Sequence, residues 1–455
     1  MKKLLLFASL MVAFASQAQD YWTEYATSQP AASTGMRSIS IVNDNVTWLS
    51  NSCGTASCTA IRRYSKTTNG GTVWTTGVVD LGANSANLEI ANIFGISDQV
   101  AYASVFPKAA GAIGGVYVTT NGGSLWTRQN TAVFNGADGA SFCNVVHFFN
   151  ANEGFAMGDP SGGSFEIYTT SNGGANWTRV SAGNIPAALD PEEYGLTNQY
   201  TFSGDTVWFG TTFGRIYKST NKGATWTVVQ SPILDFGGGI NGSESGDMSF
   251  TDANNGLLQT SDYFLYGTAD GGATWTEIIW AGMMRNFGIA EVPGLPNTYV
   301  SVGEDLDNAE RGSSYTTDGG LNWVNINDNP DAEHVQGGVV AFLNENTGFA
   351  SGFSTSAAVG GIYKWNGEPL LKTTVFSNDK AFTASPNPTS GMVQLSGKNI
   401  STVTVYDVLG KQVLNSNYSA LNTVSLDMSS FNNGVYMVKV VNAQGSSSTI
   451  KVVKQ

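Results

Sequence analysis

The chain has 455 residues, of which 41% are apolar, 13% are charged and 11% are aromatic, with 54 glycines and 12 prolines. This composition excludes a disordered or collagen-like chain and favours an all-β protein of more than one domain. A net charge of -13 argues against nucleic-acid binding, because a polyanion would be repelled.

Residues 1–18 have the pattern of a signal peptide. Two lysines precede an apolar run from Leu4 to Ala15 that only Ser9 interrupts, and small residues follow at positions 16 and 18. The run is shorter than the roughly 20 residues that a membrane-spanning helix needs. We therefore expect cleavage before Gln19 and export of the protein. No later stretch has a membrane-spanning length, so we expect a protein that is not transmembrane.

Cysteine and histidine usage limits the redox and metal chemistry of the chain. Cys53 and Cys58 fall in one loop rich in Gly, Ser and Thr. In an exported protein a disulfide between them is one expectation, and two free thiols are the alternative. The two histidines, His147 and His334, show no ligand spacing relative to a cysteine pair. We expect no cofactor and no such metal site, and leave a structural calcium ion as an alternative.

The charge is distributed unevenly along the chain. Residues 19–375 contain 14 basic and 32 acidic residues, whereas residues 376–455 contain 6 lysines and 3 aspartates. This difference indicates two domains with a linker between them, which we place at residues 369–383.

A short motif recurs along the first domain. Its six copies are TTNGGTVW (67–74), TTNGGSLW (119–126), TSNGGANW (170–177), STNKGATW (219–226), TADGGATW (268–275) and TTDGGLNW (316–323). The tryptophans recur every 48 to 52 residues, a period that suits a four-stranded propeller blade.

Each position of the motif has a structural explanation. The Asn or Asp can accept backbone N–H groups in an Asx-turn, the Gly pair supplies positive φ for a tight hairpin, and the Trp begins the next strand. Six equivalent copies favour a structural role over a catalytic one. The residues concerned are Asn69, Trp74, Asn121, Trp126, Asn172, Trp177, Asn221, Trp226, Asp270, Trp275, Asp318 and Trp323.

The repeats predict a closed ring. Two strand-like runs precede each motif, so every repeat supplies four antiparallel strands, which we call A to D. The last repeat, at 339–368, lacks a strand that begins with Trp, and the amino-terminal segment supplies one at Trp22, 52 residues before Trp74. We therefore predict that residues 19–368 form a seven-bladed β-propeller closed by its amino-terminal strand.

The motif resembles the Asp-box of sialidase-like β-propellers, also called BNR repeats. That set includes sialidases, sortilin-type receptors, xyloglucan-active glycosidases and photosystem II assembly factors. The resemblance covers about residues 20–368, and it implies the fold more than an activity.

The last domain, residues 384–455, reads as a small β-sandwich because apolar residues alternate between Gly-, Asn- and Pro-containing turns. The segments 385–388 (SPNP), 405–407 (VYD) and 434–436 (GVY), with the terminal lysines, closely resemble the type A sorting domain of the Bacteroidetes type IX secretion system. The alternative is an ordinary immunoglobulin-like module.

This resemblance has consequences for partners and location. It implies recognition by the type IX secretion machinery, cleavage of the domain, and release of the body or its attachment to surface lipopolysaccharide. The protein would then be extracellular or on the outer-membrane surface of a Bacteroidetes-type bacterium.

A ligand site is expected on one face of the propeller. The motif hairpins share a face with the A–B turns, so the B–C and D–A loops share the opposite face, and function most often lies on such loops. These loops are 104–115, 187–198, 233–247, 303–313 and 328–338, and all but the first are rich in carboxylates. Binding of a glycan or protein is one interpretation, and a solvated acidic surface is the other. The binding candidates are Asp190, Glu193, Tyr194, Asp235, Phe236, Asp305 and Arg311.

A glycoside hydrolase is the alternative function. It needs two carboxyl groups about 5 to 9.5 Å apart, and the candidate pair is Asp247 with Glu304. A sialidase would further need three converging arginines, for which Arg37, Arg215, Arg285 and Arg311 are available. The Arg-Ile-Pro signature of that family is absent, because residues 36–39 read MRSI. We therefore predict a binding module, with a secreted glycosidase as the second hypothesis.

Overall fold

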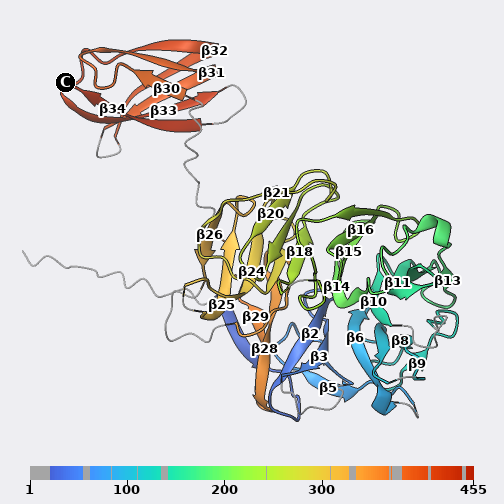
Figure 1. The fold of residues 1–455 in the computed structure, drawn as a ribbon. Helices are drawn as coiled ribbons and strands as arrows, with labels where there is room; N and C mark the ends of the chain where they lie inside the picture. The colour runs from blue at the N-terminus through green and yellow to red at the C-terminus, as the bar shows by residue number, and fades with distance from the viewer. Residues whose placement is uncertain are drawn as a thin grey trace, which may run out of the picture. The chain divides into compact units, whose positions relative to one another are not determined.

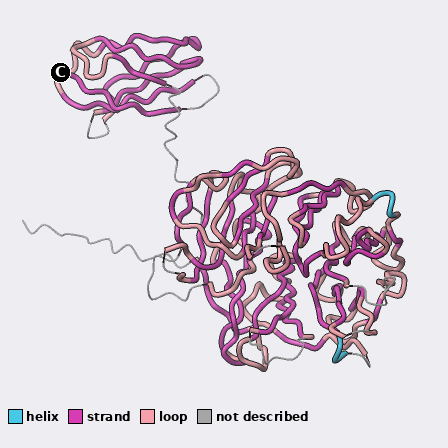
Figure 2. Tube along the Cα trace, in the orientation of Figure 1, coloured by secondary structure: helices cyan, strands magenta, loops and turns pink. Residues whose placement is uncertain are grey.

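The computed structural model divides into two compact units, Met1–Leu371 and Lys372–Gln455, which are described separately. Strands make up nearly all of the regular structure (Figure 2). The expected signal peptide and most of the expected linker lie outside the described residues. The structure describes residues 21–54, 62–82, 85–109, 111–134, 142–241, 243–307, 309–326, 335–367, 370, 382–407, 411–442 and 447–455.

The first unit is a ring of seven sheets in its described part (Figure 1). Blade 1 contains β2 (Thr34–Ile41), β3 (Thr47–Cys53), β4 (Arg63–Thr67) and β5 (Thr75–Val78). Blade 2 contains β6 (Leu88–Gly95), β7 (Ala101–Pro107), β8 (Gly115–Thr119) and β9 (Thr127–Arg128). Blade 3 contains β10 (Cys143–Phe148), β11 (Gly154–Ser161), β12 (Ser164–Thr170) and β13 (Thr178–Arg179). Blade 4 contains β14 (Gly195–Ser203), β15 (Thr206–Thr211), β16 (Arg215–Ser219) and β17 (Thr227–Gln230).

The remaining blades complete the ring. Blade 5 contains β18 (Gly246–Phe250), β19 (Gly256–Thr260), β20 (Leu265–Thr268) and β21 (Thr276–Glu277). Blade 6 contains β22 (Ala281–Gly282), β23 (Gly288–Glu291), β24 (Tyr299–Glu304), β25 (Arg311–Thr316) and β26 (Asn322–Asn325). Blade 7 contains β27 (Val340–Asn344), β28 (Thr347–Ser356), β29 (Val359–Trp365) and β1 (Trp22–Ala26). Two 3-10 helices, η1 (Ser85–Asn87) and η2 (Ala182–Asn184), lie in connecting loops of the described chain.

The A strands line the centre of the ring. They contact one another in the order β2, β6, β10, β14, β18, β23 and β27, and β27 contacts β2 again. Side chains on these strands bond to the main chain of the next blade: the amide of Ile93 donates to Ser38 Oγ at 3.1 Å, and that of Val146 donates to Asn92 Oδ1 at 3.0 Å. The all-β, seven-bladed propeller predicted from the repeat is confirmed.

The amino-terminal strand completes the seventh sheet. β1 pairs antiparallel with β29, and Trp22 lies opposite Trp365. The two indole rings meet edge to face at 5.0 Å, and Trp22 Nε1 donates to Ser313 Oγ at 2.9 Å. The first and last parts of the propeller chain are therefore joined by a hydrogen-bonded ladder as well as by buried aromatic surface.

The repeated hairpins follow the geometry that their sequence demands. In the third copy, Asn172 Oδ1 accepts the amide of Asn176 at 2.9 Å, and Thr170 Oγ1 accepts that of Gly174 at 3.0 Å. Gly173 and Gly174 have φ of 63° and 74°, which a side-chain-bearing residue rarely adopts. Five of the six motif tryptophans are at most 6% exposed: Trp74, Trp126, Trp177, Trp226 and Trp323.

Blade 6 departs from the predicted four strands. The two-residue strand β22 pairs parallel with β26, with Gly282 beside Trp323. The amide of Ala281 donates to the carbonyl of Leu321 at 2.9 Å. Gly282 has φ of 89°, and an added Cβ there would lie 1.9 Å from the carbonyl oxygen of Trp323. A glycine therefore permits this close approach, which the repeat pattern did not predict.

The second unit is a β-sandwich of five strands in its described part: β30 (Phe382–Ser385), β31 (Met392–Tyr406), β32 (Gln412–Asp427), β33 (Gly434–Asn442) and β34 (Ser447–Lys454). The first half of β31 pairs with β30 and its second half with β33, while β32 follows both halves. Alternate residues such as Val393 and Leu395 are fully buried in the core between the layers.

Candidate functional site

The loops of the propeller fall on two faces. The amide of Gly70, in the first motif hairpin, donates to the carbonyl of Asn45 in the A–B turn of the same blade. Motif hairpins and A–B turns therefore share one face, here called the hairpin face. The B–C and D–A loops end on the other, here called the loop face, where the candidate residues lie.

Glu193 is a buried ion-pair partner. Its carboxylate is 0% exposed and binds Arg215, with 2.6 Å between Oε2 and Nη2. The same carboxylate oxygen accepts the amide of Leu189, and Arg215 Nη2 also donates to Tyr217 Oη at 2.6 Å. Burial raises the pKa of the Tyr217 hydroxyl. Glu193 therefore fixes the loop before β14, and its side chain does not face solvent.

Asp235 and Phe236 are also internal, in contrast to their predicted place on an exposed rim. Asp235 is 0% exposed. Its carboxylate accepts four backbone amides, those of Gly237, Gly239, Ile240 and Asn241. Phe236 is 2% exposed and packs in the core between blades 4 and 5. The expectation that Phe236 is an accessible binding residue is wrong, because the loop turns both this ring and Asp235 inward, whereas Leu234 is 60% exposed.

Asp305 belongs to a second buried ion pair. Its Oδ2 lies 3.2 Å from Nη1 of Arg285, and the two side chains are 2% and 1% exposed. Arg285 Nη1 donates to the carbonyl of Glu310, and Nη2 to Asn325 Oδ1 at 3.2 Å. Burial lowers the pKa of the Arg285 guanidinium, and the Asp305 charge opposes that shift. This cluster connects the loop before β23, which carries Arg285, to the loop between β24 and β25, which carries Asp305 and Glu310.

Arg311 and Glu304 form a more exposed pair. Arg311 Nε lies 3.3 Å from Glu304 Oε1, with side chains 45% and 29% exposed. The guanidinium also lies 5.8 Å from the ring centroid of Phe287, which is 39% exposed. A cation beside an aromatic face in partial contact with solvent is a recognisable binding element. Arg311 and Glu304 are thus accessible members of the predicted site.

Asp247, the other carboxylate of the proposed catalytic pair, holds two blades together. Its Oδ2 accepts the amide of Ile289 in blade 6 at 3.0 Å, and Oδ1 accepts that of Met248 at 2.9 Å. Burial raises the pKa of the Asp247 carboxyl to about 6, and the amide donors oppose the rise. Asp247 and Glu304 thus have separate partners, and the catalytic role of the pair stays a prediction.

The two remaining binding candidates lie on the loop before β14. Asp190 Oδ1 accepts the amide of Glu192 at 2.9 Å and so shapes that loop. The side chain of Tyr194 is 38% exposed, and the amide of Tyr194 is held by Thr212 Oγ1 at 2.9 Å. Tyr194 is thus an accessible aromatic residue on the loop face, as expected.

The sequence reasoning missed a set of exposed apolar side chains on the loop face of blades 4 to 6. The sequence does carry a signal for this set, because large apolar residues also lie in the loops between the predicted strands. The residues, which we call the apolar loop set, are Leu189 (67% exposed), Leu234 (60%), Ile240 (50%), Phe264 (47%), Phe287 (39%) and Leu306 (61%).

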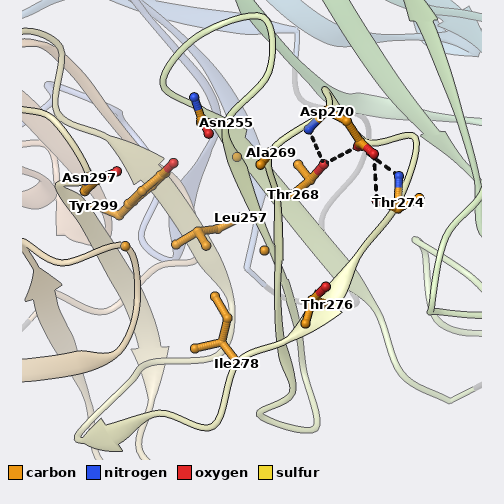
Figure 3. A pocket seen from close by; sticks show the side chains of 13 residues that line it. Asn255, Leu257, Thr268, Ala269, Asp270, Thr274, Thr276, Ile278, Asn297 and Tyr299 are labelled. Carbon is orange, nitrogen blue, oxygen red and sulfur yellow. Dashed lines mark hydrogen bonds between the residues drawn. The ribbon is translucent and has the colours of Figure 1, made fainter. Parts of the chain in front are cut away.

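The hairpin face has a cavity of about 440 Å³ between blades 5 and 6 (Figure 3). Leu257 and Ile278 point into the space between the two sheets, and Asn255 and Asp270 lie nearer its rim. Tyr299 enters from blade 6. No residue of this cavity except Asp270 belongs to the set singled out from the sequence.

Three further expectations concern metal, membrane and disulfide. Within the described residues, no group of three or more His, Cys, Asp or Glu side chains is arranged to hold a metal ion. In the same part of the chain, no helix has the length and apolar character to cross a membrane. Cys53 ends β3, whereas Cys58 lies outside the described residues, so their pairing stays a prediction. Cys143 is a free, buried thiol.

Comparison with known families gave two matches. Residues 384–455 match the model of the secretion system C-terminal sorting domain. Residues 109–244 match the model of photosynthesis system II assembly factor YCF48. The comparison with curated proteins found no match.

Solved structures share the propeller fold. YCF48 bound to D1 peptide is 14% identical, with a TM-score of 0.50 over 76% of this chain and 97% of that one. YCF48 from Cyanidioschyzon merolae is 16% identical, with a TM-score of 0.51 over 77% and 100%. An ancestral GH74 enzyme is 13% identical, with a TM-score of 0.41 over 94% and 63%. The likeness to the two YCF48 structures supports the propeller fold and leaves the ligand open.

Proposed function

Because the chain is a BNR-type β-propeller that ends in a type IX secretion sorting domain, we propose that this secreted or cell-surface protein binds a protein ligand. The proposed binding surface is the loop face of blades 4 to 6. The type IX machinery recognises the terminal domain, and the propeller carries the ligand-binding function. Attachment of the mature body to lipopolysaccharide is part of the same proposal.

The apolar loop set is the observation that carries this proposal. Its six members lie on loops that end on one face, and each is at least 39% exposed. Exposed apolar side chains grouped on one surface mark interaction sites in soluble proteins. A protein surface buries such side chains, whereas a glycan would chiefly need hydrogen-bonding groups beside an aromatic ring. Tyr194 and the Phe287–Arg311 contact supply the residue types that are enriched in protein interfaces.

The charged groups of the loop face favour binding over hydrolysis. The four arginines considered for a sialidase site each pair with a carboxylate of the chain: Arg37 with Glu89, Arg215 with Glu193, Arg285 with Asp305 and Arg311 with Glu304. Guanidinium groups neutralised in this way are poor candidates for gripping a substrate carboxylate. Asp247 is likewise held by backbone amides. The glycosidase alternative therefore gains no support from these contacts.

Site-specific photo-crosslinking tests the proposal. A photoreactive phenylalanine analogue replaces Leu234 on the loop face or, as matched control, Leu125 on the hairpin face; the two side chains are 60% and 59% exposed. In the native host, with secretion intact, we expect one defined protein adduct at position 234 and none at 125. Equal labelling at both positions would contradict the proposal, as would release of sugar from a polysaccharide by the purified protein.

A further inference from the structure

Each blade presents one residue pair from its B and C strands to the following blade. The pairs lie at equivalent register positions, because each partner on the C strand occupies the position just before the motif or its counterpart. They are Trp48 with Lys66, Tyr102 with Val118, Phe155 with Thr169, Trp208 with Lys218, Leu257 with Gly267, Val300 with Tyr315 and Phe349 with Lys364. Six pairs contain an aromatic ring, and only Leu257 with Gly267 has neither a ring nor a long side chain on the C strand.

In blades 1 and 4 the pair consists of a tryptophan and a lysine, and both side chains contact the following blade. In blade 1, Lys66 Nζ lies 4.6 Å from the ring centroid of Trp48. The same ammonium donates to the carbonyls of Asp98 at 2.9 Å and Gly122 at 3.0 Å, both in blade 2. The ring packs against Gly95 and Trp126 of blade 2, while the cation bonds to carbonyls of the A–B turn and the motif hairpin of that blade.

Blade 4 repeats this arrangement. Lys218 Nζ lies 5.5 Å from the ring centroid of Trp208 and donates to the carbonyl of Ala253 in blade 5. Trp208 Nε1 donates to the carbonyl of Gly271, in the hairpin of blade 5, at 2.9 Å. Two separate blades therefore set an indole and an ammonium against the following blade, with Trp48 Nε1 donating to the carbonyl of Ser97 in an A–B turn and Trp208 Nε1 to that of Gly271 in a motif hairpin.

The cavity described above lies where blade 5 lacks both groups. Leu257 and Gly267 line it on one side, and Tyr299 and Gly319 line it from blade 6 (Figure 3). Gly319 holds the motif position that Gly122 holds in blade 2, where the carbonyl accepts Lys66. A volume of about 440 Å³ is within the range of small-molecule sites.

The lining of the cavity matches the missing groups. Ile278 supplies partly exposed apolar surface over a closely packed base of Leu257 and Tyr299, each 3% exposed, and Asn255 and Asp270 supply oxygens. The pKa of Asp270 is lowered to about 2, chiefly by its hydrogen bonds with Thr274, so this carboxylate is charged at neutral pH. An apolar cleft with a carboxylate at its rim favours a ligand that is aromatic and cationic.

We propose that the cavity between blades 5 and 6 binds an aromatic ring carrying a nearby ammonium group, which takes the places that Trp48 and Lys66 occupy in blade 1. The ligand is an arylalkylamine, or the neighbouring aromatic and lysine side chains of a partner chain. This site lies on the hairpin face and is independent of the apolar loop set, so either proposal can fail without the other.

Tryptamine is the probe for this site, with indole and propylamine as probes for the ring alone and the amine alone. Isothermal titration of the full mature protein is expected to show one tryptamine site and at least about tenfold weaker binding of each fragment. An amide-capped Lys-Trp dipeptide distinguishes the sources: tighter binding than tryptamine identifies a partner chain, and weaker binding identifies a free amine. Failure of both tryptamine and the dipeptide to bind would overturn the proposal.

The double variant Leu257→Trp, Gly267→Lys gives blade 5 the Trp–Lys pair that blades 1 and 4 carry at the equivalent positions, and should fill the cavity. A Cβ at Gly267 would approach only flexible ends of the Ile278 and Leu257 side chains within 4 Å, the nearest at 3.0 Å. We expect a melting temperature at or above that of the wild type and at least about tenfold weaker tryptamine binding. The control Val118→Lys adds the lysine to an interface that already has its ring, and it should leave binding unchanged.

Leu257→Phe provides a second variant with a smaller change. Partial filling of the cavity should weaken tryptamine binding while far-ultraviolet circular dichroism stays that of the wild type. Undiminished tryptamine binding in a folded Leu257→Phe or double variant would place the ligand elsewhere and contradict the proposal.

Discussion

Removing the carboxylate of Asp305 should destabilise the propeller strongly. In Asp305→Ala, the guanidinium of Arg285, which is 1% exposed, loses its charged partner. Breaking a buried ion pair in this way costs about 3–5 kcal/mol, because an uncompensated charge stays buried. The contacts of Arg285 with Asn325 and the Glu310 carbonyl remain, so we expect a loss of about 3 kcal/mol.

The size of the thermal shift follows from the length of the propeller. An unfolding entropy of about 2.1 cal/mol/K per residue over roughly 350 residues makes 1 kcal/mol equivalent to about 1.4 °C. Asp305→Ala should therefore lower the melting temperature by about 4 °C in differential scanning calorimetry. The matched control is Glu304→Ala, which removes the exposed pair with Arg311 and should cost at most about 1 kcal/mol.

A second substitution identifies the cause of the loss. Replacing both partners, in Arg285→Met with Asp305→Leu, removes the buried charge altogether and should recover most of the stability. If Asp305→Ala melts within about 1 °C of the wild type, Asp305 is not the internal partner described here. Asp305 would then be available for the ligand binding that the sequence predicts.

Three further changes test other parts of the structure. Trp22→Ala should cost about 2–3 kcal/mol, because this half-buried ring packs against Trp365 in the closing sheet; an unchanged melting temperature would contradict closure by the amino-terminal strand. Asn172→Ala should cost about 1–1.5 kcal/mol by freeing the amide of Asn176, and chemical denaturation measures it; a neutral result would deny the hairpin role. Burial raises the pKa of Asp247 from 3.8 to about 6, so its contribution to stability is complete below pH 3.8 and is lost as the pH rises through about 6. The melting temperature of the wild type minus that of Asp247→Asn should therefore fall across this pH range, and a flat difference would contradict the assigned environment.

The ring of blades was predictable because its signal is periodic and local. Each motif fixes a hairpin through Asx-type hydrogen bonds and two glycines, and each tryptophan marks the next strand. The place of Trp22 followed from the same period. The extra strand β22 was not predictable, because it depends on one glycine, Gly282, meeting the backbone beside Trp323. Such a contact joins elements whose sequences carry no pairing signal.

The site was less predictable because charge in a sequence does not reveal burial. Glu193, Asp235 and Asp305 look like an exposed acidic rim, yet each is at most 2% exposed and bonded internally. Loop residues can return to the core when arginines or backbone amides satisfy them. The converse also holds, since Leu234 stands exposed in a loop where an apolar residue would be expected to pack inward.

The central claim is that exposed apolar side chains on the loop face bind a protein ligand. The most direct test is the dissociation constant of the partner recovered by crosslinking, measured with the wild type, Leu234→Asp and Leu125→Asp. We predict at least about tenfold weaker binding for Leu234→Asp and an unchanged constant for Leu125→Asp. Equal affinity in all three proteins, with their folds intact, would contradict this account.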